Sequence, residues 1–249
     1  MLWLPVHRPR PTAPVGLSIS PTTISGLQVW YSTAALPFGA LYGPSSGQDV
    51  PDLSGHNRNG KLFTNNLTVN PEPNLNSRKT FGLISGGSER GFQVGGSYNP
   101  TRPWTIFMVF STDNSTPPVE TVLCGIPFAA APWNIKGPTG GPLTLISYPS
   151  GTPTTIAQSS TNLAQNTGYC IAVTYSTGGA FEVYVNAVSE SSGTNNVSTS
   201  SGTFVVGRDI SDTFSIDGSF AELAFYNVIV SGSNIVSLSQ SFMDYYGLG

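Results

Sequence analysis

The side chains that could act as acids, bases or nucleophiles are few in this chain and lie far apart in the sequence. Hydrolysis of a glycosidic bond with retention of configuration needs two carboxyl groups about 5 to 5.5 Å apart. The six glutamates are isolated from one another and form no motif of paired acids on one strand: Glu72, Glu89, Glu120, Glu182, Glu190 and Glu222. The sequence leaves open an inverting pair of distant carboxylates.

Nucleophilic catalysis has little more support. A Ser-His-Asp triad would have to use His7 or His56, and both lie in segments that we expect to be a terminal arm and a solvated turn. Residues 43–47 (GPSSG) match the G-x-S-x-G nucleophile elbow. No apolar strand precedes them and no helix follows, so we interpret the match as chance. We therefore expect no catalytic residue and a protein that is not an enzyme.

A better candidate for binding is the irregular stretch 126–142 (IPFAAAPWNIKGPTGGP), which interrupts the rhythm of short strands. It carries Trp133 beside Asn134 and Lys136. A Trp in a Pro/Gly-rich loop could stack on a sugar or a partner protein, with the two polar side chains as hydrogen-bonding groups. The alternative is that Trp133 folds under its own loop as a small satellite core.

The elements that would position such a site are strands. Residues 220–226 (FAELAFY) place apolar groups on both faces of a strand, which predicts a central strand covered on two sides. A helix should follow, with Ser231 as its N-cap, an apolar stripe of Ile235, Leu238, Phe242 and Tyr245, and Gly247 as its stop. Further short strands are expected at 27–32, 79–84, 90–94, 104–111, 120–125, 143–147, 154–158, 169–176 and 181–188.

The end of the chain resembles the C-terminus of concanavalin A-like jelly rolls of the laminin-G/pentraxin-like type. The matching residues are Gly218, Ala221, Glu222, Leu223, Tyr226, Asn227, Ser231, Tyr246 and Gly247. Weaker motifs of the same family follow in order at residues 52–60 (DLSGHNRNG), 103–106, 184–186 and 204–208. Two departures are Asn234, where the family has an acidic residue, and Ala187, where it has glycine.

This resemblance implies an all-β fold: a two-sheet antiparallel jelly-roll sandwich over residues 27–249, with one short C-terminal helix. It also implies glycan binding as the commonest non-enzymatic role, and calcium as the metal most often bound, through loop oxygens. Asp209, Asp212 and Asp217 are the candidate calcium ligands, with solvated turn acids as the alternative. The family's glucanases carry an E-x-D-x(-x)-E signature, and this chain lacks it.

The composition and charge of the chain exclude some classes of binding partner. Charged residues make up 9% of the 249 residues, the formal net charge is −3, and the ten Lys and Arg are scattered, so we expect no nucleic-acid binding. No stretch is apolar enough to suggest membrane insertion, and the N-terminal sequence lacks the pattern of a secretory signal. Cys124 and Cys170 fit either two buried free thiols or a bridge between neighbouring strands; their number and spacing do not suggest zinc.

The first 26 residues differ from the rest of the chain. Proline recurs there without any strand period, which favours an extended N-terminal arm outside the core. The arm is either a draped terminus or an anchor that orders against a partner. The anchoring candidates are the apolar and basic residues Leu2, Trp3, Leu4, Val6, Arg8 and Arg10.

These features together predict a non-enzymatic virion structural protein, a phage tail, baseplate or fibre component or a head decoration, made in the host cytoplasm and exposed on the virion surface. We expect it to contact other virion proteins through the arm, to be a homo-oligomer on the particle, and to bind a host-surface glycan. The first alternative is a carbohydrate-binding module of a secreted or cell-surface bacterial protein, and the second is a glycoside hydrolase.

Overall fold

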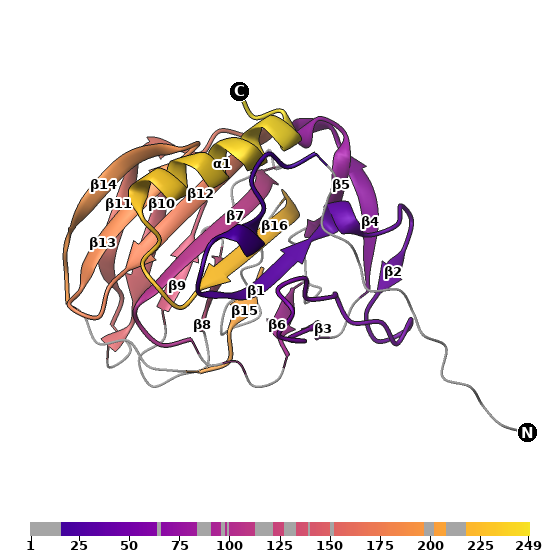
Figure 1. The fold of residues 1–249 in the computed structure, drawn as a ribbon, viewed down its shortest axis with the longest axis horizontal. Coiled ribbons are helices and arrows are strands. Elements are labelled where there is room, and N and C mark those ends of the chain that lie inside the picture. Colours follow the sequence, from indigo (N-terminus) through magenta and orange to yellow (C-terminus); the bar gives the residue numbers. More distant parts are fainter. Residues whose placement is uncertain are drawn as a thin grey trace, which may run out of the picture.

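The computed structural model describes residues 16–63, 66–83, 91–95, 98, 100–112, 122–126, 133–138, 140–149, 152–196, 202–207 and 218–249. Within these ranges the chain forms two antiparallel sheets and one α-helix (Figure 1). The nine-stranded sheet has the order β14-β13-β12-β7-β16-β5-β4-β2, with β1 also paired to β16, and the seven-stranded sheet has the order β11-β10-β9-β8-β15-β6-β3. The predicted all-β sandwich with one C-terminal helix is confirmed.

The elements have the following bounds. The strands of the nine-stranded sheet are β1 (Leu27–Ser32), β2 (Leu41–Tyr42), β4 (Leu67–Glu72), β5 (Arg78–Leu83), β7 (Trp104–Thr112), β12 (Thr167–Tyr175), β13 (Ala180–Val185), β14 (Val188–Thr194) and β16 (Gly218–Tyr226). Those of the seven-stranded sheet are β3 (Gly60–Leu62), β6 (Phe92–Val94), β8 (Val122–Ile126), β9 (Trp133–Lys136), β10 (Pro142–Ser147), β11 (Thr154–Asn162) and β15 (Val205–Val206). Three 3-10 turns, η1 (Pro21–Thr23), η2 (Thr33–Ala35) and η3 (Pro73–Leu75), and the helix α1 (Gly232–Tyr246) complete the described elements.

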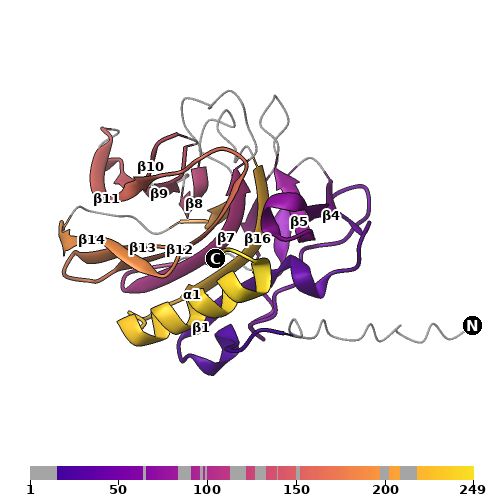
Figure 2. The same ribbon diagram turned by 90° about the horizontal axis from the view of Figure 1, so that it is seen from above.

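The molecule has three layers, which Figure 2 shows from above: the seven-stranded sheet, the nine-stranded sheet, and α1 on the outer face of the latter. Strand β16 lies at the centre of its sheet, between β7 on one side and β5 and β1 on the other. All of its side chains are buried because one face meets the opposite sheet and the other meets the helix. The predicted central strand is therefore confirmed.

The two faces of this central sheet contribute to two separate hydrophobic cores. The core between the sheets is rich in aromatic rings, among which Trp104 and Trp133 stack with ring centroids 4.7 Å apart. The second core lies between the nine-stranded sheet and α1 and contains Trp30 with the predicted helix residues Ile235, Leu238 and Phe242. The helix begins and ends where its caps predict, because the Ser231 side chain accepts a hydrogen bond from the Asn234 amide and Gly247 adopts φ 68°.

The predicted turn at residues 52–60 closes the open edge of β1. Asp52 accepts hydrogen bonds from the backbone amides of Trp30, Ser54 and Arg58, at 2.9 to 3.0 Å. The Leu53 amide donates to the Trp30 carbonyl at 2.8 Å. An unpaired strand edge is a site for unwanted pairing with other chains, so this motif has a structural role.

Residues 16–26 correct the predicted domain boundary. This end of the expected arm packs on the domain, because Leu17, Ile19 and Ile24 contact the core under α1. The Ser241 hydroxyl holds Ile19 through both its backbone amide (3.0 Å) and its carbonyl (3.1 Å), and the Tyr226 hydroxyl donates to the Pro21 carbonyl. Apolar side chains at every second or third position allow this extended segment to dock, so the folded unit includes it.

Both cysteines are free and buried. Cys124 lies in β8 of one sheet and Cys170 in β12 of the other. Burial raises the pKa of both thiols, that of Cys170 to about 12. They therefore behave as small core residues, which confirms the first of the two interpretations of the sequence.

Candidate functional site

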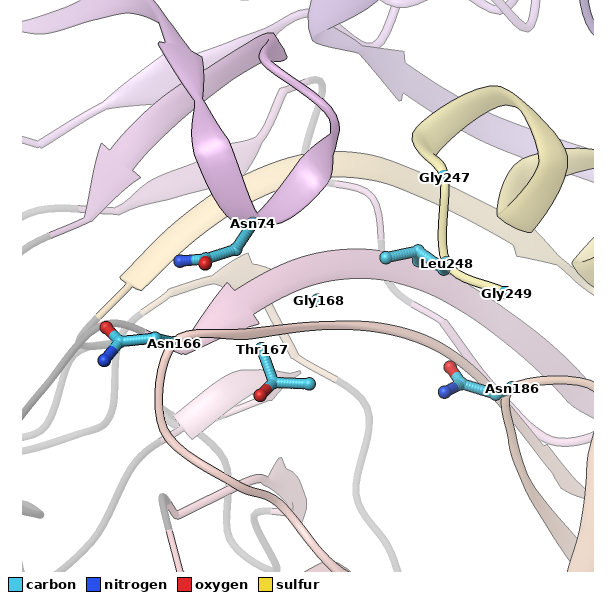
Figure 3. Close-up of a pocket in the computed structure, with 8 residues that line it drawn as sticks. All are labelled: Asn74, Asn166, Thr167, Gly168, Asn186, Gly247, Leu248 and Gly249. Carbon is cyan, nitrogen blue, oxygen red and sulfur yellow. The ribbon is translucent and has the colours of Figure 1, made fainter.

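An open pocket lies at one end of the nine-stranded sheet and has a volume of about 330 Å³. Its described lining is mostly polar and has no charged side chain: Asn74, Asn166, Thr167, Gly168, Asn186 and residues 247–249 (Figure 3). These residues come from four separate segments of the chain: η3, the β11–β12 turn with the start of β12, the β13–β14 turn, and the end of α1. The pocket is thus assembled by the sheet topology and not by one motif.

The three asparagines are positioned by tight backbone turns. Asn166 has φ 48° and Asn186 has φ 47°, the left-handed region that asparagine tolerates better than other residues with a side chain. Asn74 lies in the short 3-10 turn η3, whose start is capped by Glu72, since the Glu72 side chain accepts from the Asn74 amide at 3.0 Å. Fixed turns hold the side chains at defined places before any ligand arrives, which lowers the entropy cost of binding.

Two glycines let the segments approach closely enough to form the pocket. A Cβ atom on Gly168 would lie 2.6 Å from the Asn74 carbonyl oxygen and 2.5 Å from Leu248 Cδ2. One on Gly247 would lie 2.9 Å from Asn76 Cβ, and its φ of 68° also favours glycine. Any larger side chain at Gly168 would push the C-terminal residues away from η3.

The hydrogen-bonding groups of the pocket are only partly used by the protein. The side-chain amides of Asn74 and Asn166 make no hydrogen bond within the described part of the chain. By contrast, the side-chain oxygen of Asn186 (Oδ1) accepts from the backbone amide of Cys170 at 2.9 Å. The Thr167 hydroxyl donates to the Gln165 carbonyl at 2.8 Å and can still accept. In Figure 3, Asn74 and Asn166 lie to one side of Gly168 and Asn186 lies to the other. A ligand in the pocket would therefore meet amide donors and acceptors from both sides.

The predicted binding residues Trp133, Asn134 and Lys136 lie elsewhere, and the structure corrects the expected loop to a strand. Residues 133–136 form β9, which pairs with β8 and β10. The Trp133 ring is buried between the sheets, with 1% of its surface exposed, against Trp104. Burial of that ring stabilises the core but leaves no face for stacking on a sugar. The alternative that Trp133 is a core residue is closer to the structure, although it packs in the main core and not in a satellite core.

Asn134 and Lys136 point away from the inter-sheet core, because strand side chains alternate. Both are nevertheless buried, at 3% and 5% exposure. The Lys136 ammonium lies 5.4 Å from the centre of the Tyr148 ring, and Asn134 lies over Gly125 of β8. The strand thus separates the three predicted residues onto two faces, so they do not form one exposed site.

The remaining predicted site residues lie outside the described residues. These are the candidate calcium ligands Asp209, Asp212 and Asp217, and the arm residues Leu2, Trp3, Leu4, Val6, Arg8 and Arg10. In the part of the chain that the structure describes, no group of three or more His, Cys, Asp or Glu side chains gathers as a metal site would require. Of the described helices, none has the length and apolar character needed to cross a lipid bilayer.

Glu222 is a carboxyl group in the core beneath α1. It is fully buried and accepts hydrogen bonds from Trp30 Nε1 (2.9 Å), the Ser32 hydroxyl (2.5 Å) and the Tyr246 hydroxyl (2.8 Å). Burial raises its pKa to about 7, and the three donors oppose that rise because they favour the carboxylate. Because it is fully buried and all three of its donors belong to the protein, we assign it a structural role.

The sequence contained a signal for only some of the pocket. In the sequence, Asn186 belongs to the family motif at 184–186, within a predicted strand at 181–188, and Gly247 is the predicted helix stop, but no pattern links either residue to a site. Asn74 and Asn166 are exposed or half-exposed turn residues in a chain rich in Asn, Ser and Thr. Asn166 comes directly before Thr-Gly at the start of a strand, which marks a turn. That this turn lies beside η3 depends on the assembled sheet and cannot be read from the sequence.

Comparison with known proteins places the chain in a family. A model of the concanavalin A-like lectin/glucanases superfamily matches residues 86–236, more than half of the chain. No curated protein matches the sequence.

Solved structures share the fold at low sequence identity. Domain 4 of the extracellular GH43 arabinanase AbnA from Geobacillus stearothermophilus, in complex with arabinotriose, has a TM-score of 0.62 and 16% identity, covering 87% of this chain and 100% of that domain. The binding domain of Paraclostridial Mosquitocidal Protein 1 has a TM-score of 0.64 and 14% identity, covering 92% of this chain and 56% of that one. Trypanosoma rangeli sialidase has a TM-score of 0.55 and 14% identity, with 87% of this chain matched to 33% of the enzyme. The family match and the two-sheet architecture agree: the chain belongs to the concanavalin A-like lectin/glucanases superfamily and has its lectin-like jelly-roll fold.

Proposed function

We propose that this protein binds carbohydrate at the asparagine-lined pocket without modifying it, as a surface component of a phage virion. One observation carries the binding proposal: the side-chain amides of Asn74 and Asn166 have no hydrogen-bond partner within the described part of the chain. Both residues lie in tight turns that line an open pocket of a lectin-like fold. An amide both donates and accepts, which matches the hydroxyl groups of a sugar. Exposed polar groups in a concave, preformed site are what recognition of a small polar ligand requires.

The non-enzymatic part of the proposal is supported by the chemistry of the lining. No described side chain of the pocket is a carboxyl, imidazole or thiol group, and glycoside hydrolysis ordinarily uses two carboxyl groups on opposite sides of the scissile bond. The Glu72 carboxyl group, next to η3, is buried and accepts hydrogen bonds from the Asn74 backbone amide and the Ser219 hydroxyl. Amides can hold a sugar but cannot transfer a proton to its leaving group at neutral pH.

The virion part rests on the composition of the chain. Only 9% of residues are charged, and Leu2, Trp3, Leu4 and Val6 give the proline-rich arm an apolar group suited to burial against another particle protein. Residues 16–26 fasten the base of this arm to α1, so an anchored arm would hold the jelly roll on the particle. We expect a homo-oligomer there, with the pocket displayed towards host-surface glycans.

The second candidate is a carbohydrate-binding module of a secreted or cell-surface bacterial protein. The observation that favours it is the likeness to AbnA domain 4, which this chain matches over its whole length. Binding chemistry would be the same in both cases, and only the attachment of the domain would differ.

A glycan array probed with purified full-length protein tests the binding proposal. We expect binding to a restricted set of glycans, weakened by Asn74→Ala, and no release of reducing ends during prolonged incubation with the bound glycan. An array without binding would contradict the proposal, and turnover of a bound glycan would contradict its non-enzymatic part. For the virion part, mass spectrometry of purified particles should find the chain, and its absence there would leave the secreted module.

A further inference from the structure

The pocket has features that select the class of sugar. Resting on the proposed function, we propose that it takes a single uncharged sugar unit and discriminates against acidic sugars such as uronic and sialic acids.

Among the residues that the structure describes, the lining offers no countercharge for a carboxylate. Its side chains are three amides, one hydroxyl and one isobutyl group, and its other members are glycines. A carboxylate bound here would lose water without gaining a cationic partner, which costs far more than the transfer of a hydroxyl group that finds an amide. Neutral hydroxyl groups therefore fit the lining better than an anion does.

Two fixed negative features lie next to the pocket. The carboxyl group of Glu72 is directly behind the asparagine of η3, because it accepts from the Asn74 backbone amide at 3.0 Å. Residues 247–249 follow the end of the 15-residue helix α1, where the helix dipole carries partial negative charge on its last carbonyl groups. The Glu72 carboxyl group disfavours an anionic ligand, and the helix end offers such a ligand no positive partial charge.

The cation Arg78 contacts this end of the helix, and its guanidinium already has partners there. Arg78 donates from Nε to the Tyr245 carbonyl at 2.9 Å, and its guanidinium lies 4.2 Å from the centre of the Tyr245 ring. These contacts direct its charge towards the end of α1, where it compensates the helix dipole. Arg78 is also absent from the pocket lining, so it does not provide the bidentate contact that a carboxylate needs.

The size of the pocket limits the bound portion of the glycan. Its volume of about 330 Å³ is close to the lower end of the roughly 300 to 1,000 Å³ that small-molecule sites occupy. A single sugar ring fits such a volume, while the remainder of a longer chain would extend into solvent through the open side. A monosaccharide glycoside should thus retain most of the affinity of the larger glycan.

The experiment uses matched pairs of ligands that differ only in one carboxylate. Full-length ¹⁵N-labelled protein is titrated with methyl glycosides of glucose, galactose, mannose, arabinose and N-acetylglucosamine, with the methyl uronosides of glucose and galactose, and with methyl sialoside. The readout is the shift of the side-chain amide resonances of Asn74 and Asn166. We expect at least one neutral glycoside to bind, and the acidic counterparts to bind at least about tenfold more weakly.

A pair of matched variants localises the binding. Asn166→Gly removes a pocket amide, and Asn57→Gly removes an exposed asparagine with a similar φ of 57° in the turn at 52–60. Glycine is favourable at both positions, so neither variant strains the backbone. Loss of one hydrogen-bonding group should weaken binding about three- to tenfold in Asn166→Gly, and Asn57→Gly should bind like the unmodified protein.

Four results would overturn the inference. Acidic glycosides that bind as tightly as their neutral partners would refute the selectivity while leaving glycan binding intact. Binding that is insensitive to Asn166→Gly would place the sugar elsewhere on the domain. Glycans that bind on an array while every methyl glycoside fails would refute recognition of a single unit, and failure of all saccharides would overturn the proposed function as well.

Discussion

The hydroxyl group of Tyr246 donates a 2.8 Å hydrogen bond to Oε1 of Glu222 and so joins the last residue of α1 to the central strand β16. The same carboxyl group accepts from Trp30 and Ser32 of β1, and all of these donors are buried. One acidic side chain therefore connects the helix and two strands at the layer interface. A buried carboxyl group of this kind gives the fold a measurable dependence on pH.

Stability should change with pH through Glu222. Its folded pKa of about 7 lies above the ordinary value of 4.5, so the folded state binds this proton more tightly than the unfolded state does. Its contribution is complete below about pH 4.5 and is lost as the pH rises through about 7, a change on the order of 3 kcal/mol. Urea unfolding at pH 5 and at pH 8 gives the free energy of unfolding at each pH. Between these two values it should fall more in the unmodified protein than in Glu222→Gln, whose amide cannot titrate. Parallel pH profiles would contradict this assignment.

Tyr246→Phe should destabilise the fold without changing its shape. The substitution keeps the ring but removes a donor to a buried carboxyl group, which typically costs about 1.5 to 3 kcal/mol. Tyr148→Phe is a matched control, because this half-exposed ring keeps its contact with Lys136 when the hydroxyl is removed. Thermal unfolding at pH 8 should separate the two variants, and equal midpoints would show that the Tyr246 hydroxyl contributes nothing.

Gly168→Ala should damage the pocket and the fold together. Its Cβ atom would lie 2.6 Å from the Asn74 carbonyl oxygen, so η3 or the C-terminal residues must move, at a cost of about 1 to 3 kcal/mol. Gly82→Ala serves as the control, because its Cβ atom would meet nothing within 4 Å. Unfolding midpoints and glycan binding should both fall for Gly168→Ala alone; a normal affinity in that variant would separate the pocket geometry from binding.

The attachment of residues 16–26 should depend on Ser241. Ser241→Ala removes both hydrogen bonds to Ile19. If the attachment of the segment is weakened by about 1 kcal/mol, its detached state becomes roughly five times more populated, and the Ile19 amide exchanges faster by the same factor. Hydrogen exchange of the Ile19 amide measures this directly. Ser237→Ala, which alters the same helix at a half-exposed position, should leave the rate unchanged. Equal rates in the two variants would show that apolar packing alone holds the segment.

Local sequence patterns predicted the parts of the fold whose cause is local. Residues 220–226 alternate two apolar faces, Ser231 and Gly247 cap the helix, and Asp52 closes its own turn, and each of these features appears in the structure as expected. Strands β9 and β14 were not predicted as observed. Pro and Gly surround Trp133 in the sequence, and β14 reads VSESSGT without an apolar face. Both segments therefore form strands because they pair with neighbouring strands and not because of a local pattern.

The pocket could not be predicted because its residues have no shared pattern. Asn74, Asn166 and Asn186 lie in three turns that the strand order brings to one end of the sheet. Trp133 was predicted as a candidate because an aromatic ring beside polar residues is typical of sugar sites, yet the same ring fills the core against Trp104. Residue type alone cannot distinguish these two uses of a Trp.

The central claim is that the asparagine-lined pocket binds carbohydrate. Isothermal titration of the double variant Asn74→Ala/Asn166→Gly with the glycan that the unmodified protein binds most tightly on an array tests it most directly. The structure predicts a loss of affinity of about tenfold or more, at an unfolding midpoint close to that of the Asn57→Gly control. Unchanged affinity in the folded double variant would contradict the claim.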